Sequence, residues 1–541
     1  MPDPEQSQQP HKPEAVKDQG CPVEMYDGRR CGRPIYDAPS GLDEKPVCLM
    51  HSRDPNKDDA EFRAEFERIL DVAREGVADF TGFVFASACY TRREFKPECI
   101  FRGATFTQAA VFSDATFAQA ADFRRATFTQ DANFRGATFM QEADFREATF
   151  TQDASFLEAT FKQRANFWHA SFTQAAFFAS ATFMRAAKFS DAEFMRDAIF
   201  WLATFTQAAD FRGAGFKQGA GFQAASFLEA AMFRETRFRE DKERLPGPVF
   251  SLAQFERPEA VTFYKTYLGQ ALFHNCDVSK FVFSTVRWRR RSNGKSMVFE
   301  EYVDLKHDAA DALKPEQNSA DEQNYGLIAE LYQQLKGNYD DRRDYWTAGD
   351  FHYGEMEMKR LACPRLTWLA WLEAKLSGKP RLRKLGEQCT KLQSNVWLLS
   401  KLRWWHQRMG LAAWYRRASD YGESWGKPLL WLGVILLLFA ALYPFVGLKL
   451  AATKAPPLSA TSIQIQTSSP QAADLRYWNH EHPGRLFWHS LMTSLGVAAF
   501  QRDLAYEPTY PWGRVLALLE LLLTSTLIAL FLLAVRRQFR R

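Results

Sequence analysis

The chain has 541 residues, more than one hydrophobic core normally organises, so several domains are expected. Its formal net charge of +5 is small for this length and says little about partners. The 47 Phe against 17 Tyr and 15 Trp indicate that a repeated element uses phenylalanine. The eight cysteines are sparse and irregularly spaced, which argues against a disulfide scaffold.

Residues 1–20 are polar and rich in proline, without the apolar segment of a signal peptide. They are expected to form a disordered tail that starts in the cytoplasm.

The next segment, residues 21–60, contains the pattern C-x9-C-x16-C-x2-H. Three thiolates and an imidazole suit tetrahedral zinc, and a closed shell of four protein ligands is structural rather than catalytic. The first gap of nine residues is longer than that of the usual zinc knuckle, so a small cap with unligated cysteines is the alternative. The predicted zinc ligands are Cys21, Cys31, Cys48 and His51.

From residue 101 onward Phe recurs in alternating steps of five and six residues, and an Ala stands two residues before nearly every Phe. Five residues turn an α-helix by about 500°, so successive Phe would not share a helical face. In an extended segment residues two apart point to the same side, which directs both Ala and Phe inward. We therefore predict short β segments joined by corners, with four segments in each coil. The predicted core residues include Phe106, Phe112, Phe117, Phe123, Phe128 and Phe134.

The recurring motifs A-T-F-x-Q and A-D-F-R resemble the units of pentapeptide-repeat proteins. This resemblance implies a right-handed quadrilateral β-helix, which we expect over residues 78–288, with a break at ERLPGP. The extra residue in alternate units is expected to lengthen two opposite faces of each coil.

The outward positions of the repeat carry the polar residues. Some pentapeptide-repeat proteins imitate DNA, but residues 101–240 hold 15 Lys plus Arg and 15 Asp plus Glu, so neither a DNA mimic nor a surface for nucleic acid is expected. Glutamines recur on one face every second unit and should form a structural ladder: Gln108, Gln130, Gln152 and Gln174.

Residues 320–425 are expected to be helical. Within them, residues 324–361 predict two helices divided at Gly337 and Asn338, similar to a tetratricopeptide pair and to a segment of membrane-attached pentapeptide-repeat proteins with a channel-like C-terminus. His352, Glu355 and Glu357 are interpreted as a solvated helix face, with a metal or acid–base cluster as the alternative. From residue 366 to 425 the chain is rich in Trp, Leu, Lys and Arg, which suits helices on the cytoplasmic membrane surface.

Two apolar segments, residues 428–448 and 515–535, are each long enough to cross a bilayer as a helix. Arginines precede the first, and RRQFRR at 536–541 follows the second. Both basic flanks lie away from the intervening loop, so we expect an inner (cytoplasmic) membrane of bacterial type with both chain ends in the cytoplasm.

The loop between the two spans contains residues 484–503, an apolar segment that is too short to cross a membrane and is expected to be re-entrant. Its SLMTSLG resembles the pore-helix-to-filter segment of two-span cation channels, which implies a homo-oligomer, a tetramer if the resemblance extends that far. The motif T-x-G-[Y/F]-G is absent from it, so potassium selectivity is not expected. The predicted pore-like residues are Thr493, Ser494, Leu495, Gly496, Val497 and Glu520.

Glu520 lies within the second apolar segment, where a carboxylate is costly. We expect it to face a pore or a neighbouring subunit, or else to snorkel toward the outer surface.

These features predict a mixed fold: a β-helix, a helical linker and a transmembrane hairpin with a pore-like segment. The predicted function is a channel-like membrane protein that passes or senses ions. The alternative is a non-conducting, membrane-anchored scaffold whose β-helix binds a protein partner. An enzyme is not expected, because no motif brings together a nucleophile, a base and an orienting group.

Overall fold

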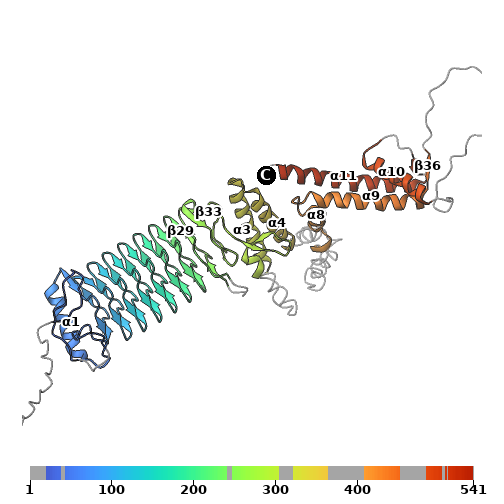
Figure 1. Ribbon diagram of the computed structural model, residues 1–541. Helices are drawn as coiled ribbons and strands as arrows, with labels where there is room; N and C mark the ends of the chain where they lie inside the picture. Colours follow the sequence, from blue (N-terminus) through green and yellow to red (C-terminus); the bar gives the residue numbers. More distant parts are fainter. Residues whose placement is uncertain are drawn as a thin grey trace, which may run out of the picture. The chain divides into compact units, whose positions relative to one another are not determined.

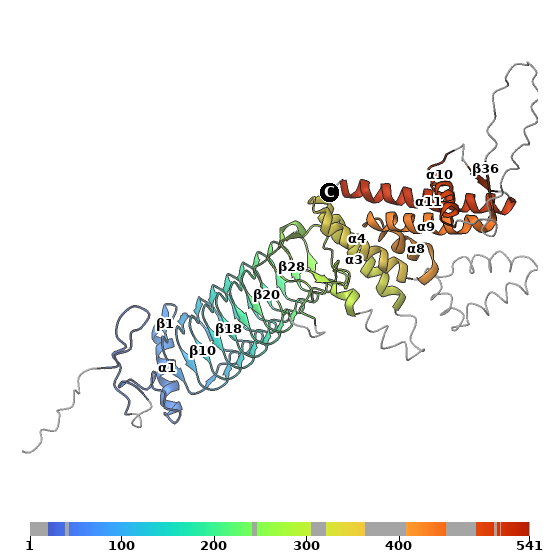
Figure 2. The same cartoon turned by 45° about the vertical axis from the view of Figure 1, so that its right-hand side comes forward.

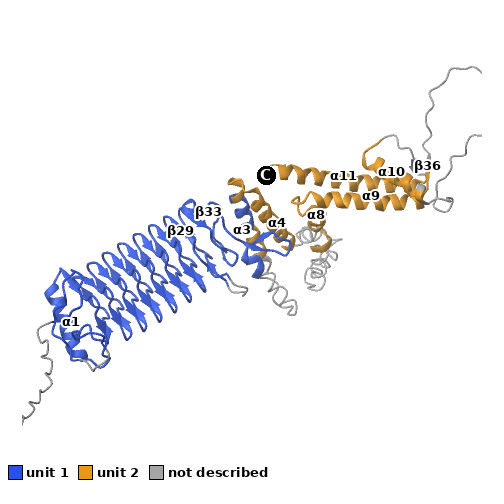
Figure 3. Cartoon of the chain, viewed as in Figure 1, with its two compact units in different colours: residues 1–318, 330–338 blue, residues 319–329, 339–541 orange. Residues whose placement is uncertain are grey.

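The computed structural model divides the chain into two compact units, residues 1–318 with 330–338 and residues 319–329 with 339–541 (Figure 3). The predicted tail, apart from Gly20, and the predicted surface helices before residue 407 lie outside the described residues. The described residues are 20–37, 43–240, 246–303, 321–362, 407–450, 483–501, 506–508 and 510–539.

Unit 1 is a β-helix whose strands form four parallel sheets of ten, seven, eight and eight strands (Figures 1 and 2). Each strand pairs with the strand one coil further on, as in the register Thr127↔Thr149 and Ala132↔Ala154. A coil therefore consists of two of the eleven-residue units, which confirms the predicted fold class. The β-helix begins at β1 (Val77–Asp79) and ends at β33 (Val282–Ser284), and one coil comprises β9 (Ala121–Asp122), β10 (Thr127–Phe128), β11 (Ala132–Asn133) and β12 (Thr138–Phe139).

The core of the β-helix consists of stacked phenylalanine rings. The ring centroids of Phe112 and Phe134 lie 5.0 Å apart at an interplanar angle of 3°, and Phe134 stacks in the same way on Phe156. Rings on different faces meet edge to face, as Phe112 and Phe123 do at 5.9 Å and 79°. The six phenylalanines named above are at most 1% exposed.

The extra residue of alternate units lies in the corners and not in the strands. Residues 123–126 connect β9 to β10, whereas the shorter segment 129–131 connects β10 to β11. The corner at residues 123–126, which lies within the five-residue step from Phe123 to Phe128, is a β-turn in which the amide of Ala126 donates to the carbonyl of Phe123 at 3.1 Å, and Arg125 has a φ of +56°. Every strand of this coil has two residues, so the six-residue step from Phe128 to Phe134 lengthens no strand, and the expectation of two longer faces stays a prediction.

A helix absent from the sequence predictions, α1 (Asp59–Ala73), covers the first coil (Figure 1). The side chain of Asp58 caps it by accepting from the amides of Ala60 and Glu61. The ring of Phe66 stacks on Phe80 of the first coil at 4.6 Å, so the helix continues the aromatic core.

The last coils are covered by residues 330–338 of α3 (Asp321–Asp341). Nδ2 of Asn338, which is 3% exposed, donates to the carbonyls of Val278, Ser279 and Phe281 at 2.7–3.0 Å. The predicted division at Gly337 and Asn338 is wrong, since α3 continues through both residues. A two-stranded hairpin also follows the coils, formed by β34 (Arg289–Arg290) and β35 (Ser296–Met297).

The described part of unit 2 is helical apart from one short pair of strands. The two helices α9 and α11 are long and apolar enough to cross a membrane, and they contain the predicted spans except that α9 ends two residues before the predicted end. Besides the two ends of α3, unit 2 contains α4 (Tyr345–Leu361), α8 (Leu411–Ser419), α9 (Gly426–Val446), β36 (Leu448–Leu450), α10 (Pro483–Ala498), β37 (Tyr506–Pro508) and α11 (Pro511–Phe539).

The stacked core predicts the effect of removing one ring. Phe134→Ala should lower the free energy of unfolding by about 3–5 kcal/mol, because the rings of the coils before and after lose their partner and a cavity remains. Urea unfolding of the full chain in detergent, followed by circular dichroism, measures this. The control Gln130→Ala at an exposed corner should stay within about 0.5 kcal/mol, and an equal loss in both variants would contradict the stacked core.

Candidate metal centre and membrane hairpin

Four potential metal ligands meet at the N-terminal end of unit 1. The ligand atoms of Cys21, Cys31, Cys48 and His51 all lie within 4.8 Å of one another. The Cys31 and Cys48 sulfurs are 3.7 Å apart, and His51 Nδ1 lies 3.1 Å from Cys48 Sγ and 3.4 Å from Cys21 Sγ. A tetrahedral zinc with bonds of about 2.3 Å to sulfur holds its sulfur ligands about 3.8 Å apart, so the donor set fits a metal of this size.

The surrounding backbone positions these ligands. The amide of Cys31 donates to the carbonyl of Val23 and that of Cys21 to Arg33, which brings the two cysteines side by side. A tight turn joins Cys48 to His51, whose amide donates to the Cys48 carbonyl at 3.0 Å.

The hydrogen bonds of His51 determine which nitrogen can bind a metal. Its Nε2 lies 2.9 Å from the carbonyl oxygen of Thr81 and must carry a proton to donate to it. Nδ1 then has a lone pair, and it is the nitrogen that faces the three sulfurs. Arg33 donates to Cys31 Sγ at 3.2 Å, which favours a thiolate there. The hydrogen bond from Cys48 lowers the pKa of Cys31 to about 3 and raises that of Cys48.

Lys57 attaches this loop to the β-helix. Its Nζ donates to the carbonyls of Leu49 and Ser52 beside the ligands, and to that of Val84 in the first coil. Lys57 is only 4% exposed, and burial lowers its pKa to about 8.

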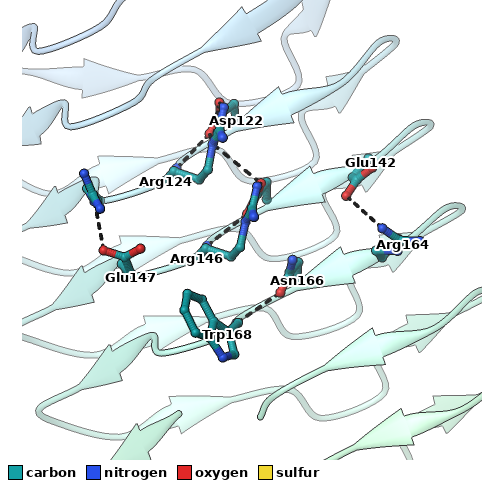
Figure 4. A network of polar contacts seen from close by, with 10 residues as sticks. Asp122, Arg124, Glu142, Arg146, Glu147, Arg164, Asn166 and Trp168 are labelled. Carbon is teal, nitrogen blue, oxygen red and sulfur yellow. Dashed lines mark hydrogen bonds and ion pairs between the residues drawn. The ribbon is translucent and has the colours of Figure 1, made fainter. Parts of the chain in front are cut away.

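The outer surface of the β-helix carries ion pairs that are internal to the repeat. In successive coils Asp122 pairs with Arg124 and Asp144 with Arg146, and Arg124 lies 3.6 Å from the next aspartate, Asp144 (Figure 4). Each aspartate also accepts from the backbone amide two residues later, so it closes the corner. Asn166 accepts from the Trp168 amide in the same way. The partners of these carboxylates are therefore arginines and backbone amides of the β-helix itself.

The hydrogen-bonded ladder of the next corner, between β10 and β11, is made of threonines. Thr129 Oγ1 donates to the Thr107 carbonyl at 3.0 Å, and Thr151 Oγ1 to the Thr129 carbonyl at 2.8 Å. The predicted glutamine ladder lies one residue further on, with Gln108, Gln130 and Gln152 exposed.

Part of the β-helix also matches a known family. Residues 101–149, 135–179 and 167–215 match the family described as Pentapeptide repeats (9 copies). Residues 101–215 are pentapeptide repeats. No curated protein and no solved structure matches the chain significantly.

The hairpin formed by the two long apolar helices α9 and α11 packs α10 against both of them. With sixteen residues, α10 is too short to cross a bilayer. Strands β36 and β37 pair in antiparallel fashion, so the chain leaves α9 and returns to α11 at the same end. The structure therefore has two long apolar helices that pack on each other and a short helix that packs against both.

A polar cluster joins the three helices of the hairpin. The carboxylate of Glu520 on α11 accepts from the Tyr443 hydroxyl of α9 at 2.6 Å and is hydrogen-bonded to Ser494 of α10. Ser494 Oγ also lies 3.2 Å from the carbonyl oxygen of Leu436 on α9. Glu520 is 0% exposed, so it does not snorkel to the surface of the hairpin.

The predicted pore-like residues 493–497 all lie inside helix α10, which continues to Ala498. Thr493, Gly496 and Val497 are buried, whereas Leu495 is 41% exposed. These residues therefore pack as a helix, and none of them forms an extended row of carbonyls.

Two glutamates of α4 are buried, and the predicted solvated face is wrong for both of them. Glu355 and Glu357 are 5% and 7% exposed. Glu355 accepts from Lys359 at 2.6 Å, and Glu357 pairs with Arg360 at 2.7 Å. The sequence pattern missed this burial because the partners that cover Glu357 lie beyond residue 410.

The polar cluster predicts how strongly the hairpin helices are joined. Tyr443→Phe removes the donor to Glu520 and should destabilise the hairpin by roughly 1 kcal/mol, as for other hydrogen bonds between membrane helices. Thermal unfolding in detergent measures this, with Leu430→Ala at an exposed position of α9 as the control. An unchanged midpoint in Tyr443→Phe would mean that this hydrogen bond does not hold α9 to α11.

Proposed function

We propose that the C-terminal hairpin is the pore-forming part of an oligomeric ion channel and that the pentapeptide-repeat β-helix is its cytoplasmic domain. The observation that carries this proposal is α10, a short helix between two long apolar helices that contacts Glu520 through Ser494. A re-entrant helix between two spans is the plan of two-span cation-channel pores, whose functional unit is an oligomer with the pore between its subunits.

The membrane orientation follows from the basic ends of the hairpin. Arg416 and Arg417 precede α9, and Arg536 and Arg537 lie in the last turn of α11. Arg537 also pairs with Glu423 at 3.2 Å, so the two basic flanks meet at one end of the hairpin. The positive-inside rule assigns this end to the cytoplasm, which we propose for an inner membrane of bacterial type.

A second candidate function is a non-conducting anchored scaffold whose β-helix binds a protein partner. The burial of Glu520 favours it, because the carboxylate is already held by Tyr443 and Ser494 of the same chain. The position of Gly496 within a helix favours it as well.

Ion flux separates the two candidates. Protein reconstituted in liposomes should conduct cations, and Glu520→Gln and Gly496→Ala should each reduce the flux, by on the order of tenfold for the loss of the carboxylate. The lipid-exposed Leu522→Ala is the control and should conduct as the wild type does. Absence of flux from a verified oligomer would overturn the channel proposal in favour of the scaffold. Flux that neither substitution changes would remove the pore assignment.

We further propose that the group formed by Cys21, Cys31, Cys48 and His51 holds a structural zinc ion. Three sulfurs and one imidazole nitrogen complete a tetrahedral shell and leave no position for a substrate. The donor separations and the protonated Nε2 of His51 support this. The ion would fasten the N-terminal loop over the first coil.

Metal analysis tests the zinc proposal. The purified protein should contain a single zinc ion per chain, and Cys48→Ser should lose it and expose α1 and the first coil to hydrogen exchange. Cys89→Ser removes an exposed cysteine outside the group and should retain the metal. Equal metal content in both variants would show that this group does not bind zinc.

A further inference from the structure

A pocket of about 420 Å³ lies between the C-terminal end of α4 and helix α8. Its lining includes the four arginines Arg360, Arg408, Arg416 and Arg417, together with Gln407. Neither the repeat nor the membrane hairpin accounts for such a concentration of positive charge in one concave site.

Glu357 supports the inner wall of this pocket. Its carboxylate accepts from Arg360 at 2.7 Å and from Arg416 at 3.3 Å, and the hydroxyl of Tyr421 donates to it at 3.0 Å. Burial acts to raise the pKa of Glu357, but the two guanidinium groups lower it below its usual value. The carboxylate therefore stays ionised and fixes the guanidinium groups of Arg360 and Arg416.

The fixed guanidinium groups retain donors for a further acceptor. Arg416 uses Nη1 to reach Glu357, which leaves its Nε and Nη2 outside that contact. Arg360 donates through Nη1 to the Gln407 carbonyl at 2.8 Å, which holds the rim of the pocket to the end of α4.

The pocket is attached to the basic end of the hairpin. Trp431 of α9 donates through Nε1 to the carbonyl of Arg417 at 3.1 Å, and α8 also packs on α11. On α8 itself, Leu411 is 90% and Trp414 is 53% exposed. Apolar and aromatic residues beside arginines are typical of a helix at the level of lipid headgroups.

We propose that this pocket binds a phosphate group at the cytoplasmic end of the hairpin. Guanidinium groups bind phosphate oxygens through paired hydrogen bonds, which lysine cannot form, and the four basic residues of this lining are all arginine. The volume exceeds that of a bare phosphate and leaves room for the rest of a headgroup or of a soluble phosphate compound. An anionic phospholipid and a soluble phosphate therefore share the chemistry that the site recognises.

Binding to the full chain in neutral detergent tests the proposal. Native mass spectrometry measures retention of phosphatidylglycerol against phosphatidylcholine, and calorimetry measures binding of inorganic phosphate. The pocket variant Arg408→Gln/Arg417→Gln should bind phosphatidylglycerol or phosphate more weakly, by roughly fivefold for each arginine removed. The control Arg514→Gln/Arg536→Gln removes the same charge at two hairpin positions that do not line the pocket.

Each outcome decides the proposal or its source of phosphate. Selective loss of phosphatidylglycerol in the pocket variant assigns the site to a lipid headgroup, and selective loss of inorganic phosphate assigns it to a soluble compound. Equal loss in both double variants would show diffuse attraction and overturn the proposal, as would the absence of binding to either probe in the wild type. Circular dichroism and gel filtration verify that all variants are folded. The assignment to a lipid headgroup rests on the proposal that the hairpin crosses a membrane. Neither binding assay depends on ion conduction, so the pocket proposal and the channel proposal can fail independently.

Discussion

The stacking of phenylalanine rings from coil to coil is the interaction on which the β-helix depends. Each ring, such as Phe128 between Phe106 and Phe150 at 4.7 and 4.8 Å, receives its contacts from the coils before and after it. Its own coil adds looser contacts, an edge contact with Phe134 at 5.9 Å and a tilted contact with Phe123 at 6.2 Å. A single coil could therefore not bury its core, and the stability of the array arises between neighbours. The first and last coils each lack one neighbour, so both ends need a cover.

The two ends are covered by different means. At the N-terminal end the rings of Phe62 and Phe66 contact Phe85 of the first coil, which extends the aromatic core into α1. The backbone there is satisfied by a charged side chain, Lys57, which reaches the carbonyl of Val84. At the other end a neutral amide, Asn338, satisfies three carbonyls of the last turn. Both side chains are nearly fully buried, and each serves carbonyls that no further strand would reach.

The sequence predicted the structural features that repeat along the chain. It missed those features that depend on one partner far away in the sequence. The spacing of Phe and Ala was enough for the sheet register, because every coil meets the same neighbours. The group of Cys48 and His51 was also predicted, since its ligand types restrict the geometry. Helix α1 was missed although Phe62, Phe66 and Leu70 share a helical face, because it follows the predicted metal-binding segment, which ends at residue 60. The burial of Glu357 could not be predicted, since Arg416 lies 59 residues away in the sequence.

Glu357 and Glu520 show two ways of burying a carboxylate in the same unit. Glu357 lies among guanidinium groups, whereas the partners of Glu520 in the described part of the chain are the hydroxyls of Tyr443 and Ser494. The Ser494 hydroxyl has a second acceptor, the Leu436 carbonyl, so it can give up its hydrogen bond to Glu520 at small cost. Tyr443, in contrast, would lose a buried hydrogen bond if Glu520 moved. A conducting assembly would therefore have to bring an aqueous path to the α10 side of Glu520 while Tyr443 continues to hold the carboxylate. A scaffold requires no such path, because the same cluster then only fixes α10 between α9 and α11.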